Sequence, residues 1–156
     1  MEITFDFGRQ GGMASNQFAV WIADAEGGMV KTVAVTNFTA RRGGWKSRKE
    51  SLPQWVADSG VAAMEQAEID AVSRATPGSR EVCYAWYRDD ASGRPVPPGK
   101  YTVNVEASLR WENRVLYKAE IDLGGEGAKA RPAAEFVGSS TAERGMLTNV
   151  VVRSIP

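Results

Sequence analysis

The chain of 156 residues is long enough to bury a hydrophobic core, and its composition is that of a globular protein. Hydrophobic residues make up 43%, and 19 basic side chains balance 19 acidic ones, so the net charge is zero. This balance argues against a nucleic-acid partner. The sequence contains no histidine, which excludes catalytic triads built on histidine and removes the commonest metal ligand.

Cys83 is the only cysteine, so no disulfide can form within the chain. It lies in the apolar run EVCYAWY, which predicts a buried thiol. No run of eighteen apolar residues is present, so we expect no membrane-spanning helix. The first residues, MEITFDFG, lack the features of a secretion signal. We therefore expect either a cytoplasmic chain or a mature form that has lost its leader.

Alternating apolar and polar residues predict strands in the first part of the chain. EITFDF, residues 2–7, alternates in this way. Two β-rich runs, 18–23 and 30–38, flank DAEGG, in which Gly27 and Gly28 supply the positive φ of a tight turn. These two runs predict a β-hairpin.

The middle of the chain predicts a short, partly helical insertion over about residues 51–75. Ser51 is suited to cap a helix with Pro53 in its first turn. The run GVAAMEQAE contains good helix formers, although Glu65 and Glu68 interrupt its apolar stripe. Pro77 ends the helical part, because the residue before a proline is pushed towards an extended conformation.

Strand patterns return in the second half of the chain. They cover EVCYAWYR (81–88), KYTVNVEASLRW (100–111), RVLYKAEIDL (114–123), AEFVGSS (134–140) and MLTNVVVRSI (146–155). Together, these segments predict a single all-β domain over residues 1–156. We expect an antiparallel Ig-like β-sandwich of about seven or eight strands, with a closed barrel as the alternative.

The segment WYRDDASGRPVPPGKYTVNVEA, residues 86–107, resembles the Ig-like repeat of the flagellar hook-capping protein. The matching positions are Trp86, Asp90, Gly93, Val96, Pro97, Gly99 and Tyr101. The resemblance implies an Ig-like fold and says nothing about function.

Over most of its length, the chain resembles a family of predicted periplasmic proteins catalogued as domain of unknown function 2271. The blocks that carry this resemblance are FAVWIADAEGGMVKTVAV, WKSRKESLPQW, IDAVSRATPGS and PVPPGKYTVNVEA, in this order. The resemblance implies an exported protein, periplasmic or extracellular, of which this chain is the mature part. It implies no activity.

The run IDAVSRATPGS is similar to the flavinylation motif D-x-x-S/T-G-A-T of FMN-carrying extracytoplasmic proteins. Asp70, Ser73, Ala75 and Thr76 match the motif, and Arg74 stands at its glycine position. The resemblance implies that a flavin transferase joins the FMN phosphate to the Thr76 hydroxyl. Arg74 could pair with that phosphate, but it lacks the backbone freedom of glycine. The alternative is a plain loop.

A basic run with two tryptophans lies at the start of the predicted insertion. It contains Arg41, Arg42, Lys46, Arg48 and Lys49, with Trp45 inside the run and Trp55 after it. Arg42, Trp45, Lys46, Arg48 and Trp55 are candidate ligand-binding residues, for a phosphate or an acidic partner against an aromatic wall. The alternative is a solvated loop whose tryptophans plug the open end of the sandwich.

Acidic and aromatic residues give weaker signals. Asp89 and Asp90 lack the spacing of a calcium site, so a turn is the better account of Asp90 and no metal is expected. The remaining strand aromatics are Trp21, Tyr84, Trp86, Tyr87 and Trp111. On strands such residues are mostly core residues, whereas an exposed row of them would indicate a sugar-binding face.

These observations predict a non-catalytic binding or accessory module of the cell envelope, with an envelope protein or a small ligand as its partner. Two alternatives stay open. One is an electron-transfer protein that carries FMN on Thr76. The other is a carbohydrate-binding module.

Overall fold

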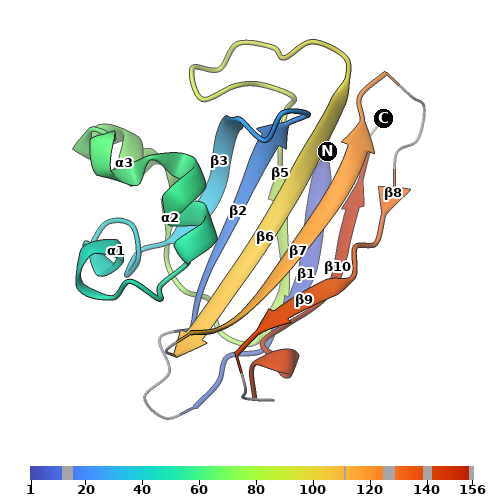
Figure 1. The fold of residues 1–156 in the computed structure, drawn as a ribbon. Coiled ribbons are helices and arrows are strands. Elements are labelled where there is room, and N and C mark those ends of the chain that lie inside the picture. The colour runs from blue at the N-terminus through green and yellow to red at the C-terminus, as the bar shows by residue number, and fades with distance from the viewer. Residues whose placement is uncertain (12–15, 111, 125–128, 139–141, 155–156) are drawn as a thin grey trace.

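Two β-sheets pack face to face, and a layer of short helices covers part of the outer face of the larger sheet (Figure 1). This computed structural model describes residues 1–11, 16–110, 112–124, 129–138 and 142–154. The all-β sandwich with a helical insertion, predicted from the sequence, is therefore confirmed. The two sheets are open, not closed into the barrel that was the alternative.

The smaller sheet contains four antiparallel strands in the order β5-β1-β10-β8. These are β1 (Glu2–Phe7), β5 (Arg80–Ala85), β8 (Lys129–Ala130) and β10 (Leu147–Arg153). The predicted alternation of β1 is present, because Ile3, Phe5 and Phe7 are buried while the residues between them are half-buried. One face of this sheet therefore forms the core, and the other meets solvent.

The larger sheet contains six strands in the order β4-β3-β2-β6-β7-β9. These are β2 (Gln17–Asp24), β3 (Met29–Thr36), β4 (Ser73–Arg74), β6 (Lys100–Arg110), β7 (Asn113–Asp122) and β9 (Ala134–Val137). The predicted hairpin is β2 and β3, and Gly27 in its turn has φ 84°. Strands β4 and β8 were not predicted, because a strand of two residues has no periodicity to detect.

The main core lies between the two sheets and is rich in aromatic rings. The ring centroid of Phe18 on β2 lies 5.4 Å from that of Phe5 and 5.2 Å from that of Phe7, both on β1. Burying one such side chain contributes roughly 1.5–3 kcal/mol. These contacts between strands far apart in the sequence hold the two sheets together.

A second hydrophobic cluster lies on the outer face of the larger sheet, under the helices. The helical elements are α1 (Gly44–Ser47), α2 (Pro53–Ser59), η1 (Val61–Ala63) and α3 (Gln66–Val72), and η2 (Ala142–Gly145) precedes β10. Trp21 and Val35 of the sheet and Trp55 and Ile69 of the helices are buried in this cluster. The helical insertion therefore has its own core.

Helix α2 is held on the sheet by the buried carboxylate of Glu106 on β6. The carboxylate accepts hydrogen bonds from the backbone N–H groups of Gln54 (3.2 Å) and Trp55 (2.9 Å), at the start of α2. It also accepts one from Arg114 on β7 at 2.8 Å. Burial raises the pKa of Glu106, because desolvation outweighs these hydrogen bonds.

Two indole groups add further hydrogen bonds between α2 and the sheet. Trp21 Nε1 donates to Asp58 Oδ2 at 3.1 Å, and Trp55 Nε1 donates to Thr32 Oγ1 at 3.0 Å. Each bond crosses from one layer to the other. Helix α2 is thus fixed at both ends of its seven residues.

The prediction that Ser51 caps α2 was wrong by one residue. Pro53 lies in the first turn, as predicted, but the N-cap is Leu52, which has left-handed backbone angles (φ 53°, ψ 55°). The backbone N–H of Leu52 donates to Ser108 Oγ, and Ser51 Oγ lies 2.6 Å from Thr39 Oγ1. Ser51 therefore bonds to a tertiary partner and not to the helix.

The prediction that Cys83 is buried was wrong, because its side chain is exposed. It lies on β5, an edge strand of the smaller sheet, where Val82 faces the core and the next residue faces out. The apolar run EVCYAWY suggested burial on both faces, whereas β5 is buried on one. The strand also ends at Ala85, earlier than predicted.

Candidate binding cleft

Helix α3 begins with a capping box and is weakly packed. Glu68 Oε2 accepts a hydrogen bond from the backbone N–H of Glu65 at 2.8 Å, and the Glu65 side chain accepts in return. These two glutamates, which interrupt the apolar stripe of the sequence, therefore start the helix. Ile69 is the buried residue of α3, so most of the surface of this helix does not contact the sheet.

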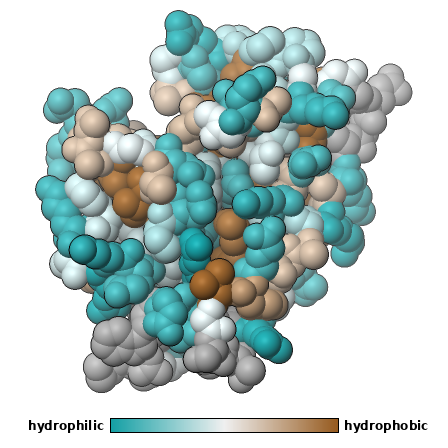
Figure 2. All heavy atoms as spheres, in the orientation of Figure 1, coloured by the Kyte–Doolittle hydropathy of each residue, from teal (hydrophilic) through white to brown (hydrophobic). Residues whose placement is uncertain are grey.

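A cleft of about 470 Å³ lies between α3, the start of β3 and the loop at 86–99. In Figure 2, the surface is indented between the helical segment at the left and this loop at the top. The apolar residues that line the cleft are Met29, Met64, Ala67, Ala71, Val72 and Ala91. A cleft of this size and lining is typical of small-molecule sites.

The cleft also contains a buried hydroxyl group that has no partner among the described residues. Ser59 Oγ, at the end of α2, is shielded from solvent and makes no hydrogen bond within the described part of the chain. Most buried polar groups are satisfied, so an exception of this kind requires an explanation. A ligand or a water molecule in the cleft would supply the missing partner.

An ion pair lies at the edge of the cleft. Lys31 Nζ, which lines it, is 2.5 Å from Asp89 Oδ2. The other oxygen, Asp89 Oδ1, is buried without a partner among the described residues. This pair connects β3 to the loop at 86–99.

The chain was compared with known proteins. The family described as "Predicted periplasmic protein (DUF2271)" matches residues 1–139. The chain belongs to this family. The family description places it in the periplasm, as the sequence resemblance implied. Comparisons with curated proteins and with solved structures found no match. Among the described residues, no helix has the length and apolar character needed to cross a membrane.

In this DUF2271 chain, the predicted flavinylation motif begins on α3. Asp70 is exposed and forms an ion pair with Arg41 (3.1 Å), and it accepts a hydrogen bond from Gln66 (2.9 Å). Ser73 Oγ donates to the Ile69 carbonyl at 2.7 Å, at the end of the helix. Both side chains therefore have local structural partners.

The rest of the motif passes through β4 to the loop before β5. Arg74 Nη1 donates to the carbonyls of Ala71 and Ser73, at 2.9 Å each, so its guanidinium closes the end of α3. The Thr76 hydroxyl is half-buried and accepts a long hydrogen bond of 3.5 Å from Gln17. A cofactor on Thr76 stays a prediction.

The basic run lies at α1, and its side chains cover aromatic rings. Lys46 Nζ is 4.9 Å from the ring centroid of Trp45, and Arg48 Cζ is 5.2 Å from the ring centroid of Phe38. Arg42 is exposed. Trp55 is fully buried and Trp45 half-buried, both in the outer cluster and not at an open end of the sandwich. Ligand binding by the run stays a prediction.

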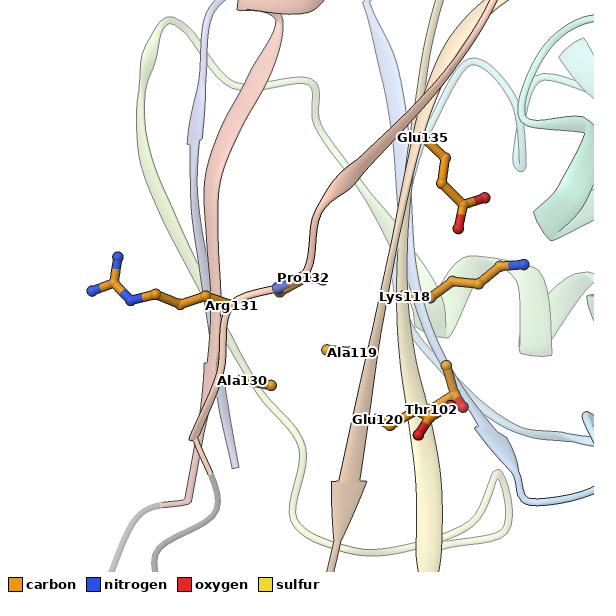
Figure 3. Close-up of a pocket in the computed structure, with 8 residues that line it drawn as sticks. All are labelled: Thr102, Lys118, Ala119, Glu120, Ala130, Arg131, Pro132 and Glu135. Atoms are coloured by element: carbon orange, nitrogen blue, oxygen red, sulfur yellow. The ribbon is translucent and has the colours of Figure 1, made fainter.

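A second hollow of about 470 Å³ opens beside β7, beyond the point where its pairing with β9 ends (Figure 3). Ala119 and Ala130 are small, and the longer side chains diverge, with Arg131 pointing away from Lys118 and Glu135 (Figure 3). No long side chains converge there, so this hollow is a weaker candidate than the cleft at α3.

The strand aromatics that the structure describes do not form an exposed row. Trp21 and Trp86 are buried, Tyr84 is half-buried and Tyr87 is 78% exposed. Trp111 lies outside the described residues. Among the described members of this set, Tyr87 is the one exposed ring, and carbohydrate binding stays a prediction.

Sequence reasoning did not find the cleft. Its polar residues are Lys31 and Thr32 on β3, Ser59 on α2 and Glu68 on α3, and Ala91 comes from a loop. No spacing in the sequence connects these segments. One feature of the sequence could have indicated the cleft: Ala67 and Ala71, whose side chains are small, lie one turn apart on a helix.

Proposed function

We propose that this periplasmic chain is a non-catalytic binding module and that it holds a small ligand in the cleft between α3 and β3. The observation that carries the proposal is the Ser59 hydroxyl, which is buried in an otherwise largely apolar cleft and has no partner among the described residues. Such a cleft with a few polar groups is the usual form of a ligand site.

The charged groups of the cleft favour binding over catalysis. Lys31 is paired with Asp89, and the Glu68 carboxylate caps α3. Both groups have structural partners, so neither is a ready acid, base or nucleophile. The absence of histidine from the sequence fits the same conclusion.

The test is to fill the cleft and measure binding. Ala71→Trp places an indole in the cleft, whereas Ala57→Trp adds the same group on the exposed side of α2. Nile red and 8-anilino-1-naphthalenesulfonate (ANS) are titrated by fluorescence. We expect saturable binding of at least one dye to the wild type and to Ala57→Trp, and its loss in Ala71→Trp. If no dye binds saturably, or Ala71→Trp binds as well as the wild type, the proposal fails.

A second candidate function is electron transfer by FMN esterified to Thr76. It is supported by the position of the hydroxyl, which is half-buried beside β4. The hydrogen bond that this hydroxyl accepts from Gln17 is long, at 3.5 Å. The test is coexpression with a flavin transferase, followed by mass measurement of the Thr76 peptide. We expect an FMN adduct on the wild type and none on Thr76→Val. An unmodified wild-type peptide rules out this function.

A further inference from the structure

The charges around the cleft identify the class of ligand, an inference that rests on the proposed function. We propose that the cleft binds an uncharged, mainly apolar molecule with a flat ring system and one hydrogen-bonding group that reaches Ser59.

Two charged side chains line the cleft in the described part of the chain, Lys31 and Glu68. Lys31 is already neutralised by Asp89, at 2.5 Å. Counting Lys31 as positive and Asp89 and Glu68 as negative, the group carries a net charge of −1. An anionic ligand would compete with Asp89 for Lys31 and would lie near the carboxylate of Glu68. It would also lose its hydration, so the cleft disfavours anions.

The apolar walls suit a flat ligand. Ala67 and Ala71 lie one turn apart on α3 and present only methyl groups to the cleft. Met29 and Met64, from β3 and the turn before α3, also line it. Methionine side chains are flexible and make favourable sulfur–aromatic contacts. The cleft therefore combines a flat wall with adaptable residues that can fit a ring system.

Among the described residues that line the cleft, Ser59 sets the polar requirement. Its hydroxyl can donate one hydrogen bond and accept others, and it has no partner among the described residues. Lys31 and Glu68 already make the bonds described above. A ligand with one donor or acceptor aimed at Ser59 satisfies this group and leaves the existing bonds intact.

A matched pair of probes tests the ligand class. N-phenyl-1-naphthylamine is uncharged, and ANS has the same ring system with an added sulfonate. Both are titrated by fluorescence against the full chain. We expect one binding site per chain for N-phenyl-1-naphthylamine, with a dissociation constant at least tenfold below that of ANS. We expect Ala71→Trp to abolish this binding.

The hydrogen bond is tested by Ser59→Ala, with Ser47→Ala as the control, since Ser47 is an exposed residue of α1 outside the cleft. Loss of one hydrogen bond should weaken binding of N-phenyl-1-naphthylamine by about three- to tenfold in Ser59→Ala. The control should bind as the wild type does. Equal affinity of Ser59→Ala and the wild type would overturn the role of Ser59.

The other outcomes separate the two proposals. If ANS binds as tightly as N-phenyl-1-naphthylamine and Ala71→Trp abolishes both, the ligand class is wrong and the binding function stands. If neither probe binds saturably, or Ala71→Trp leaves binding unchanged, the proposed function itself is overturned.

Discussion

Two buried polar groups on the helical side of the molecule differ in how they are satisfied. Glu106 is fully buried and accepts hydrogen bonds from two backbone N–H groups and from Arg114. Ser59 Oγ is buried and has no partner among the described residues. The first arrangement is structural, because it fastens α2 to the sheet. The second is consistent with a site that a ligand completes.

Removing the Glu106 carboxylate should destabilise the protein strongly. Glu106→Ala leaves the partly buried Arg114 guanidinium and the N–H groups of Gln54 and Trp55 without their acceptor. The expected loss is about 3–5 kcal/mol in the free energy of unfolding, measured by urea denaturation. Glu120→Ala, at an exposed position on β7, should change stability by less than about 0.5 kcal/mol. Equal stability of both variants would contradict the anchoring role.

Glu106 should also give stability a defined pH dependence. Burial raises its pKa above the ordinary value of 4.5. Between the unfolded and the folded pKa, the folded state therefore binds more protons, so stability falls as pH rises. The difference in unfolding free energy between the wild type and Glu106→Gln should be largest below pH 4.5 and should decrease as pH rises through the raised pKa of Glu106. An increase over this range would show that the pKa is lowered instead.

Some residue positions could be predicted from the sequence, and others could not. Alternation placed Ile3, Phe5 and Phe7 in the core, as found. It could not show that the strand with Cys83 lies at an edge with one face in solvent. Nor could it show that Ser51 bonds to Thr39. Both facts depend on tertiary neighbours that are remote in the sequence.

The helices α2 and α3 are of equal length and differ in their attachment. Helix α2 is bonded to the sheet through its first backbone N–H groups, Asp58 and the indole of Trp55. In helix α3, five of the seven residues are exposed, and the cleft lies between this helix and β3. We infer that α2 is the fixed part of the helical layer and that α3 can adjust to a ligand.

Hydrogen exchange tests this difference between the helices. The backbone amides of Gln54 and Trp55, which are bonded to buried Glu106, should exchange more slowly than those of α3 after its first turn. N-phenyl-1-naphthylamine should slow the exchange of α3 and leave α2 unchanged. If α3 is as protected as α2 in the free chain, the helices are equally fixed.

The elements that could be predicted are those with a clear strand pattern or turn signal. The long strands β6 and β7 were predicted from their strand patterns, and β2 and β3 were predicted as two β-rich runs that flank a glycine turn. The insertion was predicted only in outline, because four short helical pieces contain too few residues for a helical stripe. Packing on the outer face of the sheet determines their positions.

At the scale of the whole molecule, the two hydrophobic clusters have different roles. The cluster between the sheets forms the β-sandwich, and the outer cluster holds the helical layer on it. The cleft lies at the edge of this second layer, between α3, β3 and the loop at 86–99. Sequence could predict the sandwich but not the cleft, because three remote segments form it.

Methyl resonances of the methionines give the most direct test of binding in the cleft. Met29 and Met64 line it, whereas Met1 and Met146 are buried in the core between the sheets. Their ¹³C-labelled methyl groups are recorded by NMR while N-phenyl-1-naphthylamine is added. We predict that the resonances of Met29 and Met64 shift to saturation, since an aromatic ring lies against them, while those of Met1 and Met146 stay in place. Saturating shifts at Met1 or Met146, with Met29 and Met64 unchanged, would contradict the cleft as the binding site.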